Sequence, residues 1–152
     1  MSLSKLAQGS VATILPSCTV SEAARQMTMF SVGALVLVES PDGAPVGIIT
    51  DRDIVKMIGE GLDPKMATVA GSVGGALKTV TANEPTNQVV ALMRQNGVRR
   101  LPIVDGEGHL IGIVSLDDIL LRLGEEMADV AGTIRKEFES KDPTLSAHAR
   151  SL

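Results

Sequence analysis

Hydrophobic positions in the first half of the chain change spacing in a regular order. In TVSEAARQMTMF (19–30), Ala and Met recur at helical spacing behind an N-cap at Thr19 or Ser21. ALVLVE (34–39) is almost wholly apolar, as in a strand covered on both faces, and SPDGAP (40–45) has turn composition. VGIIT (46–50) predicts a second strand. DRDIVKMIGEG (51–61) predicts a helix with an acidic first turn and a glycine beyond its end.

The second half repeats this order. Met27 aligns with Met93, SVGALVLV (31–38) with GVRRLPIV (97–104), and PVGIITDRDIV (45–55) with LIGIVSLDDIL (110–120). Its predicted elements are a helix over 83–97, strands over 100–105 and 110–115, and a closing helix from 116. ALKTV (76–80) predicts a short strand before them. Pro102 cannot donate a ladder hydrogen bond, so we expect it on an edge strand or at a strand end.

The repeat predicts two small domains, at 8–68 and 71–131, with 132–152 forming the end of a helix and a polar tail. The fold class is α+β. The closing helix is long, and its apolar residues recur at spacings of three and four, which suits either a dimer seam or packing on the same chain. These residues are Ile119, Leu120, Leu123, Met127, Val130 and Ile134.

Composition narrows the class of protein. The 152 residues carry a formal charge of −4, which argues against a nucleic-acid partner because such partners require a basic face. The lone Cys18 excludes an intramolecular disulfide. No apolar run is long enough to span a bilayer and the start lacks a leader, so we expect a cytoplasmic protein without a membrane partner.

His109 and His148 show no ligand-like spacing, so we expect no metal site and no enzyme.

A short motif occurs once in each half, where the second strand meets the following helix. It consists of a glycine, a hydroxyl residue three positions later and an aspartate three positions after that. A carboxylate can accept two hydrogen bonds from a ribose diol, and the hydroxyl can donate to a phosphate beside the helix N-terminus. The same pair can equally act as an ordinary helix cap. The two sets are Gly47, Thr50 and Asp53, and Gly112, Ser115 and Asp118.

Arg99 and Arg100 add positive charge. They are adjacent on a strand, so their side chains point to opposite faces and could serve two different clefts. The alternative is a pair of solvated surface arginines. Gly33 and Ala34 stand at the corresponding positions of the first half, so each cleft has one arginine at most and holds a di- or triphosphate weakly.

The repeated order and paired motifs resemble the cystathionine-beta-synthase (CBS) domain pair, or Bateman module. The likeness spans roughly residues 8–131 and is fullest in NGVRRLPIVDGEGHLIGIVSLDDIL (96–120). It implies two β-α-β-β-α repeats packed sheet to sheet with pseudo-twofold symmetry. It also implies two clefts for an adenine nucleotide or related adenosyl ligand: AMP, ADP, ATP, S-adenosylmethionine or NADH. No further cofactor is required.

The resemblance also implies which residues line each cleft. Arg100 would serve the cleft with Ser115 and Asp118, and Arg99 the cleft with Thr50 and Asp53. Wall contacts would come from Ala12, Val32, Ile48, Lys78, Val98 and Ile113, although burial in the core is an equal alternative for the four β-branched residues.

Two functions follow. The first is a regulatory homodimer that senses an adenine nucleotide and signals to an effector protein supplied in trans. The second is a dimerisation scaffold with degenerate clefts that needs no ligand. Both hydroxyls and both aspartates are present, which favours the first.

Overall fold

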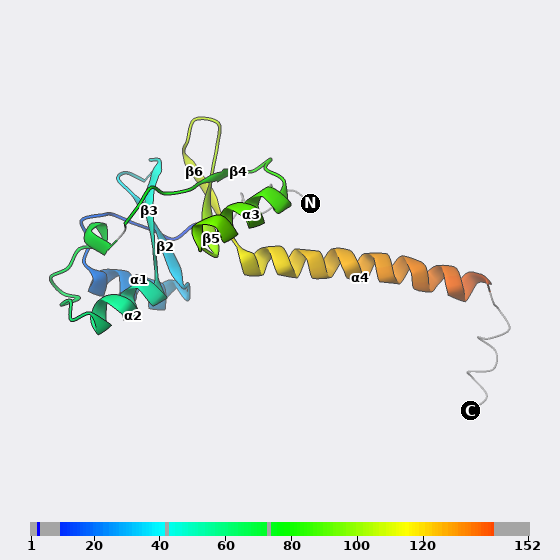
Figure 1. The fold of residues 1–152 in the computed structure, drawn as a ribbon, viewed down its shortest axis with the longest axis horizontal. Helices are drawn as coiled ribbons and strands as arrows, with labels where there is room; N and C mark the ends of the chain where they lie inside the picture. The colour runs from blue at the N-terminus through cyan, green and yellow to red at the C-terminus, as the bar shows by residue number, and fades with distance from the viewer. Residues whose placement is uncertain (1–2, 4–9, 42, 73, 142–152) are drawn as a thin grey trace, which may run out of the picture. The chain divides into compact units, whose positions relative to one another are not determined.

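A computed structural model describes residues 3, 10–41, 43–72 and 74–141 (Figure 1). It divides the chain into two units, one ending at Ser115 and one formed by the chain from Leu116 onward. Residues 8 and 9 of the first predicted domain, and the polar tail from 142 onward with His148, lie outside the described residues. No helix in the described ranges has both the length and the apolar character needed to cross a bilayer.

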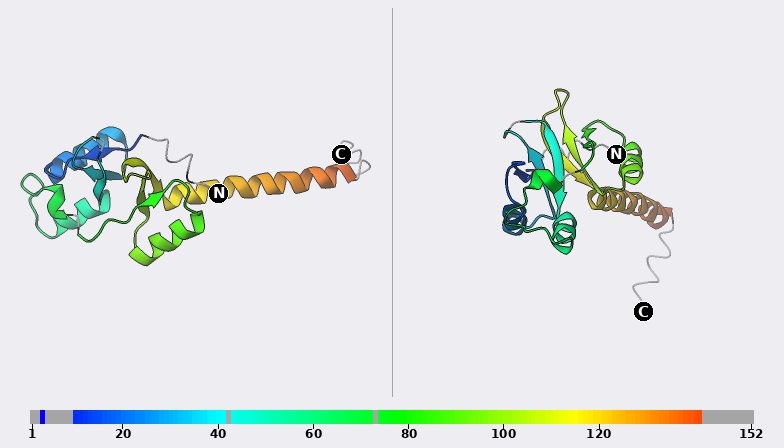
Figure 2. Two further views of the ribbon diagram at one scale, coloured as in Figure 1. Left: turned by 90° about the horizontal axis from the view of Figure 1, so that it is seen from above. Right: turned by 60° about the vertical axis from the view of Figure 1, so that its left-hand side comes forward.

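The first repeat forms a three-stranded sheet with two helices that lie next to each other (Figures 1 and 2). Strand β2 is central, parallel to β1 and antiparallel to β3. A capping box at Thr19 opens α1, and Ser31 ends it in the left-handed conformation. The elements are β1 (Thr13–Ile14), α1 (Val20–Phe30), β2 (Ala34–Val38), β3 (Pro45–Thr50) and α2 (Asp51–Gly59), followed by the 3₁₀ turn η2 (Val69–Ser72).

The second repeat has the same topology, with β5 between β4 and β6. Even the irregularity in strand pairing recurs, between Leu37 and Val38 in one sheet and between Ile103 and Val104 in the other. This match confirms the duplication. The elements are β4 (Val80–Thr81), α3 (Thr86–Asn96), β5 (Arg100–Val104) and β6 (Leu110–Ser115), and the separate unit contains α4 (Leu116–Lys141).

The prediction for Pro102 is wrong, because this residue lies in the middle of the central strand β5, opposite Ile113. Strand β4 is only two residues long and pairs with Ile103 and Val104, beyond the proline. Strand β4 therefore needs no hydrogen bond from Pro102. The missing N–H of the proline removes no hydrogen bond between β4 and β5.

Aliphatic side chains fill the core, as the scarcity of aromatic residues requires. Strand β2 is buried at every position, which agrees with its unbroken apolar sequence. In the first repeat the buried cluster joins the inner faces of α1 and α2 to the sheet, through residues that include Ala23, Leu35, Ile49 and Ile54. This packing fixes the junction between β3 and α2, where the first motif lies.

Candidate functional site

The first motif forms a reciprocal capping box at the start of α2. Asp53 Oδ2 accepts hydrogen bonds from the backbone N–H and the hydroxyl of Thr50, both at 2.8 Å. In return, the Asp53 backbone N–H donates to Thr50 Oγ1 at 3.2 Å. Both side-chain bonds use Oδ2, so Oδ1 takes no part in the box. The capping alternative is therefore correct for this pair, and its side chains are rigidly oriented.

The same arrangement occurs at the start of α1, away from the motif. Glu22 Oε2 accepts from the N–H of Thr19 at 2.7 Å and from its hydroxyl at 2.9 Å, and Glu22 N–H donates to Thr19 Oγ1 at 3.2 Å. A capping box alone therefore does not distinguish a binding site from a helix start. Any ligand site at α2 depends on the groups that surround its box.

Arg100 is such a group, and it comes from the other repeat. It begins β5, opposite Ser115 of β6, and its side chain is half-buried. Its guanidinium Nη2 lies 3.4 Å from the point where a β-carbon on Gly33 would be, and Asp51 Oδ2 lies 3.3 Å from the same point. Asp51 is the first residue of α2, and its backbone N–H donates to the Gly33 carbonyl at 3.1 Å. The structure thus brings a cation to the helix N-terminus beside Thr50 and Asp53.

This placement differs from the pairing implied by family resemblance, which gave Arg99 to the Thr50 and Asp53 cleft. Arg99 is exposed and precedes β5. The role of Asp51 was missed by the sequence analysis, since an acidic residue in a first helical turn is commonplace.

The second motif spans the end of β6 and the start of α4. Ser115 is the last residue of β6, and Asp118 lies in the first turn of α4. Both are half-buried. These positions match those of Thr50 and Asp53 in the first repeat.

The predicted wall residues differ in exposure. Ile48 and Ile113 are half-buried on β3 and β6, opposite Val36 and Pro102. Val32 and Val98 are 36% and 37% exposed, and Lys78 is exposed. Ala12 packs against the core, and its carbonyl accepts from the N–H of Val36 at 3.0 Å, so that carbonyl serves the sheet.

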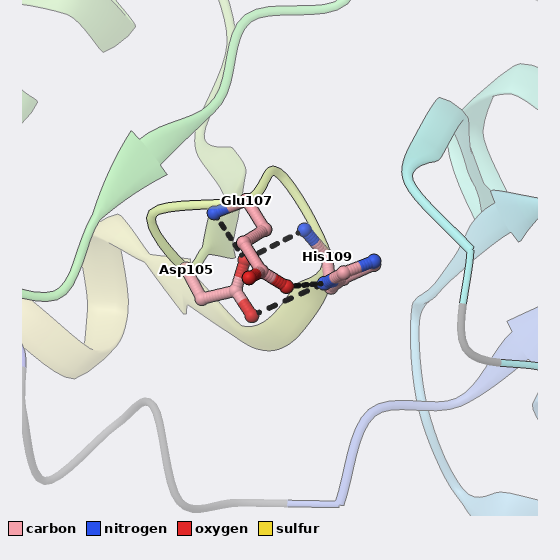
Figure 3. Close-up of side chains that lie close together, drawn as sticks. All are labelled: Asp105, Glu107 and His109. Atoms are coloured by element: carbon pink, nitrogen blue, oxygen red, sulfur yellow. Dashed lines mark hydrogen bonds and ion pairs between the residues drawn. The ribbon is translucent and has the colours of Figure 1, made fainter.

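A separate cluster lies in the turn between β5 and β6 (Figure 3), where ligand atoms of Asp105, Glu107 and His109 all fall within 4.8 Å of one another. His109 Nδ1 lies 3.3 Å from Asp105 Oδ2 and 3.5 Å from Glu107 Oε2. The sequence analysis found no ligand-like spacing around His109, but two carboxylates of its own turn lie beside the ring. The alternating Asp-Gly-Glu-Gly-His pattern was the available signal, because a tight turn brings such positions together.

Asp105 also organises the turn. Its Oδ1 accepts the backbone N–H groups of Glu107 and His109, both at 2.9 Å. The N–H of His109, with a smaller contribution from that of Glu107, lowers the pKa of Asp105 below its ordinary value. The Asp105 carboxylate therefore already stabilises the hairpin.

Comparison with known proteins agrees with this architecture. The model of the CBS domain matches residues 3–60 and 75–125. The chain is 39% identical over 121 residues to uncharacterized protein MK0525 of Methanopyrus kandleri, covering 79% of this chain and 61% of that protein. It is 37% identical over 125 residues to the CBS domain-containing protein YhcV of Bacillus subtilis, covering 81% and 86% of the two chains.

A solved structure shows the same fold. The CBS domain protein PAE2072 from Pyrobaculum aerophilum, complexed with AMP, superposes with a TM-score of 0.72 at 25% identity, covering 82% of this chain and 99% of that one. Two family matches therefore coincide with the two repeats that the sheet topology establishes. The chain belongs to the CBS domain family and carries two copies of the domain.

Proposed function

We propose that the protein binds an adenosyl ligand at the N-terminal end of α2 and regulates a partner protein through the bound state. The observation that carries this proposal is the approach of Arg100, from the second repeat, to the helix end that bears Thr50 and Asp53 in the first. The AMP bound by the Pyrobaculum protein supports the same ligand class.

Asp53 would hold the ribose. Its Oδ1 lies outside the capping box, while Oδ2 accepts from Thr50. A ribose diol can donate to both oxygens of one carboxylate. The Thr50 hydroxyl can then turn its proton to a ligand oxygen, because Oδ2 keeps the backbone N–H of Thr50 as a donor.

The charges at this end of α2 favour a ligand with few phosphates. Arg100 can hold one phosphate group, but the carboxylates of Asp51 and Asp53 lie at the same helix terminus. Each further phosphate adds negative charge near these carboxylates without adding a cation. We therefore expect affinity to fall in the order AMP, ADP, ATP.

A second site would use the equivalent residues of the second repeat. Ser115 and Asp118 are proposed there from the sequence correspondence, and Arg99 takes the place that the family resemblance gave to Arg100, because Arg100 is assigned to the first site. The proposed wall contacts of the two sites are Ala12, Val32, Ile48, Lys78, Val98 and Ile113.

The capping box at α1 supplies a matched control. Asp53→Ala and Glu22→Ala each remove the carboxylate of one box and should each lower the stability slightly. Isothermal titration with AMP should show binding to Glu22→Ala at the wild-type affinity, and at least tenfold weaker binding to Asp53→Ala. Equal affinity in the two variants would remove Asp53 from the ligand site.

The alternative function is a scaffold that needs no ligand. It is favoured by the Thr50 and Asp53 side chains, which already bond to each other. A thermal-shift series with AMP, ADP, ATP, S-adenosylmethionine and NADH separates the two functions. A ligand at a hundred times its dissociation constant adds about 2.7 kcal/mol to the free energy of unfolding. If none of the five ligands raises the melting temperature, the scaffold is the function that remains.

A further inference from the structure

Three side chains of metal-ligating type meet in the turn that joins β5 to β6 (Figure 3). Asp105, Glu107 and His109 are separated from one another by single glycines along the chain, and one ligand atom of each falls within 4.8 Å of the others. The turn lies inside the first of the two units of the chain, so its geometry is defined within that unit alone.

The distances from the imidazole to the two carboxylates fit a tetrahedral zinc ion. Zinc binds nitrogen and oxygen ligands at about 2.0–2.2 Å, so two ligand atoms of one tetrahedron stand about 3.4 Å apart. His109 Nδ1 lies 3.3 Å from Asp105 Oδ2 and 3.5 Å from Glu107 Oε2. Two edges of a coordination tetrahedron are therefore already formed. The Glu107 side chain is 82% exposed, so it can adjust the third edge, between the two carboxylates, without displacing its neighbours.

The backbone of the turn orients Asp105 for this role. Its Oδ1 accepts the N–H groups of Glu107 and His109, and its Oδ2 is left facing the imidazole. Hydrogen bonds to the outer oxygen of a ligating carboxylate fix its direction and are a regular part of metal sites. The same N–H groups lower the pKa of Asp105, so its carboxylate is ionised at neutral pH, as a metal ligand must be.

Hydrogen bonding within the turn does not use both carboxylates that face the imidazole. The Nδ1 atom of His109 carries one proton at most, so it can donate well to only one of them. The other carboxylate then faces a group of like charge, which is unfavourable. A divalent cation between the three atoms would bind the ring nitrogen and pair with both carboxylates at once.

We propose that the β5–β6 turn binds zinc, or another late divalent transition metal, through Asp105, Glu107 and His109. An imidazole ligand suits these metals, whereas calcium and magnesium prefer a larger set of oxygen ligands. Three protein ligands leave the fourth position to water, as in open zinc sites. The site departs from the sequence-based expectation of no metal, which considered spacing along the chain and not convergence in a turn.

This metal site is separate from the proposed adenosyl site. Val104 pairs with Leu110 beside the turn, whereas Arg100 lies at the opposite end of the same hairpin. The strand from Arg100 to Val104 spans about 13 Å, too far for one ligand ion to contact both ends. Asp53→Ala should therefore leave zinc affinity unchanged, so that failure of one proposal does not decide the other.

Isothermal titration of the full chain with zinc chloride tests the proposal. The other thiol and imidazole of the chain belong to Cys18 and His148, so the parent protein for this test carries Cys18→Ala and His148→Ala. We expect one zinc ion per chain, and His109→Ala should bind zinc at least tenfold more weakly. Calcium and magnesium should also bind the parent protein at least tenfold more weakly than zinc.

Asp105→Asn separates metal binding from support of the turn. The substitution keeps an oxygen that can accept both backbone N–H groups, but it removes the charge that faces the metal. Asp63→Asn is the matched control, because Asp63 Oδ1 accepts the N–H of Lys65 at 2.9 Å in a turn whose sequence has no histidine. Zinc affinity should fall at least tenfold in Asp105→Asn and stay at the parent value in Asp63→Asn.

Cobalt(II) in place of zinc gives a second readout. The parent protein should show the intense visible absorption of tetrahedral cobalt, and His109→Ala should not. A parent protein that binds no zinc, or that binds it no more tightly than His109→Ala, overturns the proposal. Calcium bound as tightly as zinc also overturns it, because the cluster would then act as a pair of carboxylates without the imidazole.

Discussion

The guanidinium of Arg100 lies against Gly33, with Nη2 3.4 Å from the position that a β-carbon on Gly33 would take. The two residues belong to different repeats, and each stands in the segment where one repeat departs from the other. Where the second repeat has its pair of arginines, the first has Gly33 and Ala34. The two segments in which the repeats depart from each other therefore meet in the structure.

Replacing Arg100 should weaken binding of the phosphate but not of the nucleoside. A charge-assisted hydrogen bond contributes about 1.5–3 kcal/mol, so Arg100→Ala should reduce AMP affinity by roughly 10- to 100-fold. Adenosine affinity should change little, because the ribose and base contacts remain. Calorimetric titration of both ligands checks this, and Arg100→Lys should restore part of the loss. An equal loss for adenosine would mean that Arg100 supports the fold of the site rather than the phosphate.

Adding a methyl group at Gly33 should disturb the same contact. The new β-carbon of Gly33→Ala would lie 3.3 Å from Asp51 Oδ2 and 3.4 Å from Arg100 Nη2. Both neighbours are ends of side chains, so Asp51 can shift by a few tenths of an ångström with little loss of stability, while the methyl group comes into contact with the guanidinium of Arg100. We expect AMP affinity to fall by a few-fold at most while the melting temperature stays nearly constant. Gly59→Ala, whose β-carbon would contact nothing within 4 Å, is the control and should bind AMP normally.

Ser31 offers a test of backbone strain. It ends α1 with φ of 53°, and its counterpart Gly97 ends α3 with φ of 63°. Residues with a β-carbon are disfavoured in this left-handed region, whereas glycine enters it freely. Ser31→Gly should therefore stabilise the protein by about 0.5–1 kcal/mol, and Gly97→Ser should destabilise it by a similar amount. Urea unfolding of the two variants measures both effects, and the same sign for both would contradict the explanation.

The capping box of α1 should lose its contribution in acid. The backbone N–H of Thr19, followed by its hydroxyl, lowers the pKa of Glu22 below the ordinary value of 4.5. Because the folded pKa is the lower one, the stabilisation is fully present above pH 4.5 and is lost as the pH falls through the folded value. Glu22→Gln should therefore have a lower melting temperature than wild type at neutral pH, and the two melting temperatures should converge as the pH falls below 4.5. If the difference in melting temperature between the two proteins does not change with pH, the charge of the Glu22 carboxylate is not its source.

Much of the fold could be predicted from spacing alone. The capping residue Thr19, the end of α3 at Gly97 and the bounds of β6 agree with the predicted elements. These features depend on interactions within a few residues, which the local sequence specifies. Pro102 was placed wrongly because the lengths of neighbouring strands, not the proline itself, decide whether its missing N–H matters.

The sequence by itself determined the duplication, the two longer strands and the helices of each repeat and the positions of both motifs, because apolar periodicity and capping act over short distances along the chain. Only the tertiary structure decided that Arg100 reaches Gly33 and Asp51, since a long side chain can take many directions and only packing between the repeats selects one. Which side chains from different repeats converge depends on how distant segments of the chain pack.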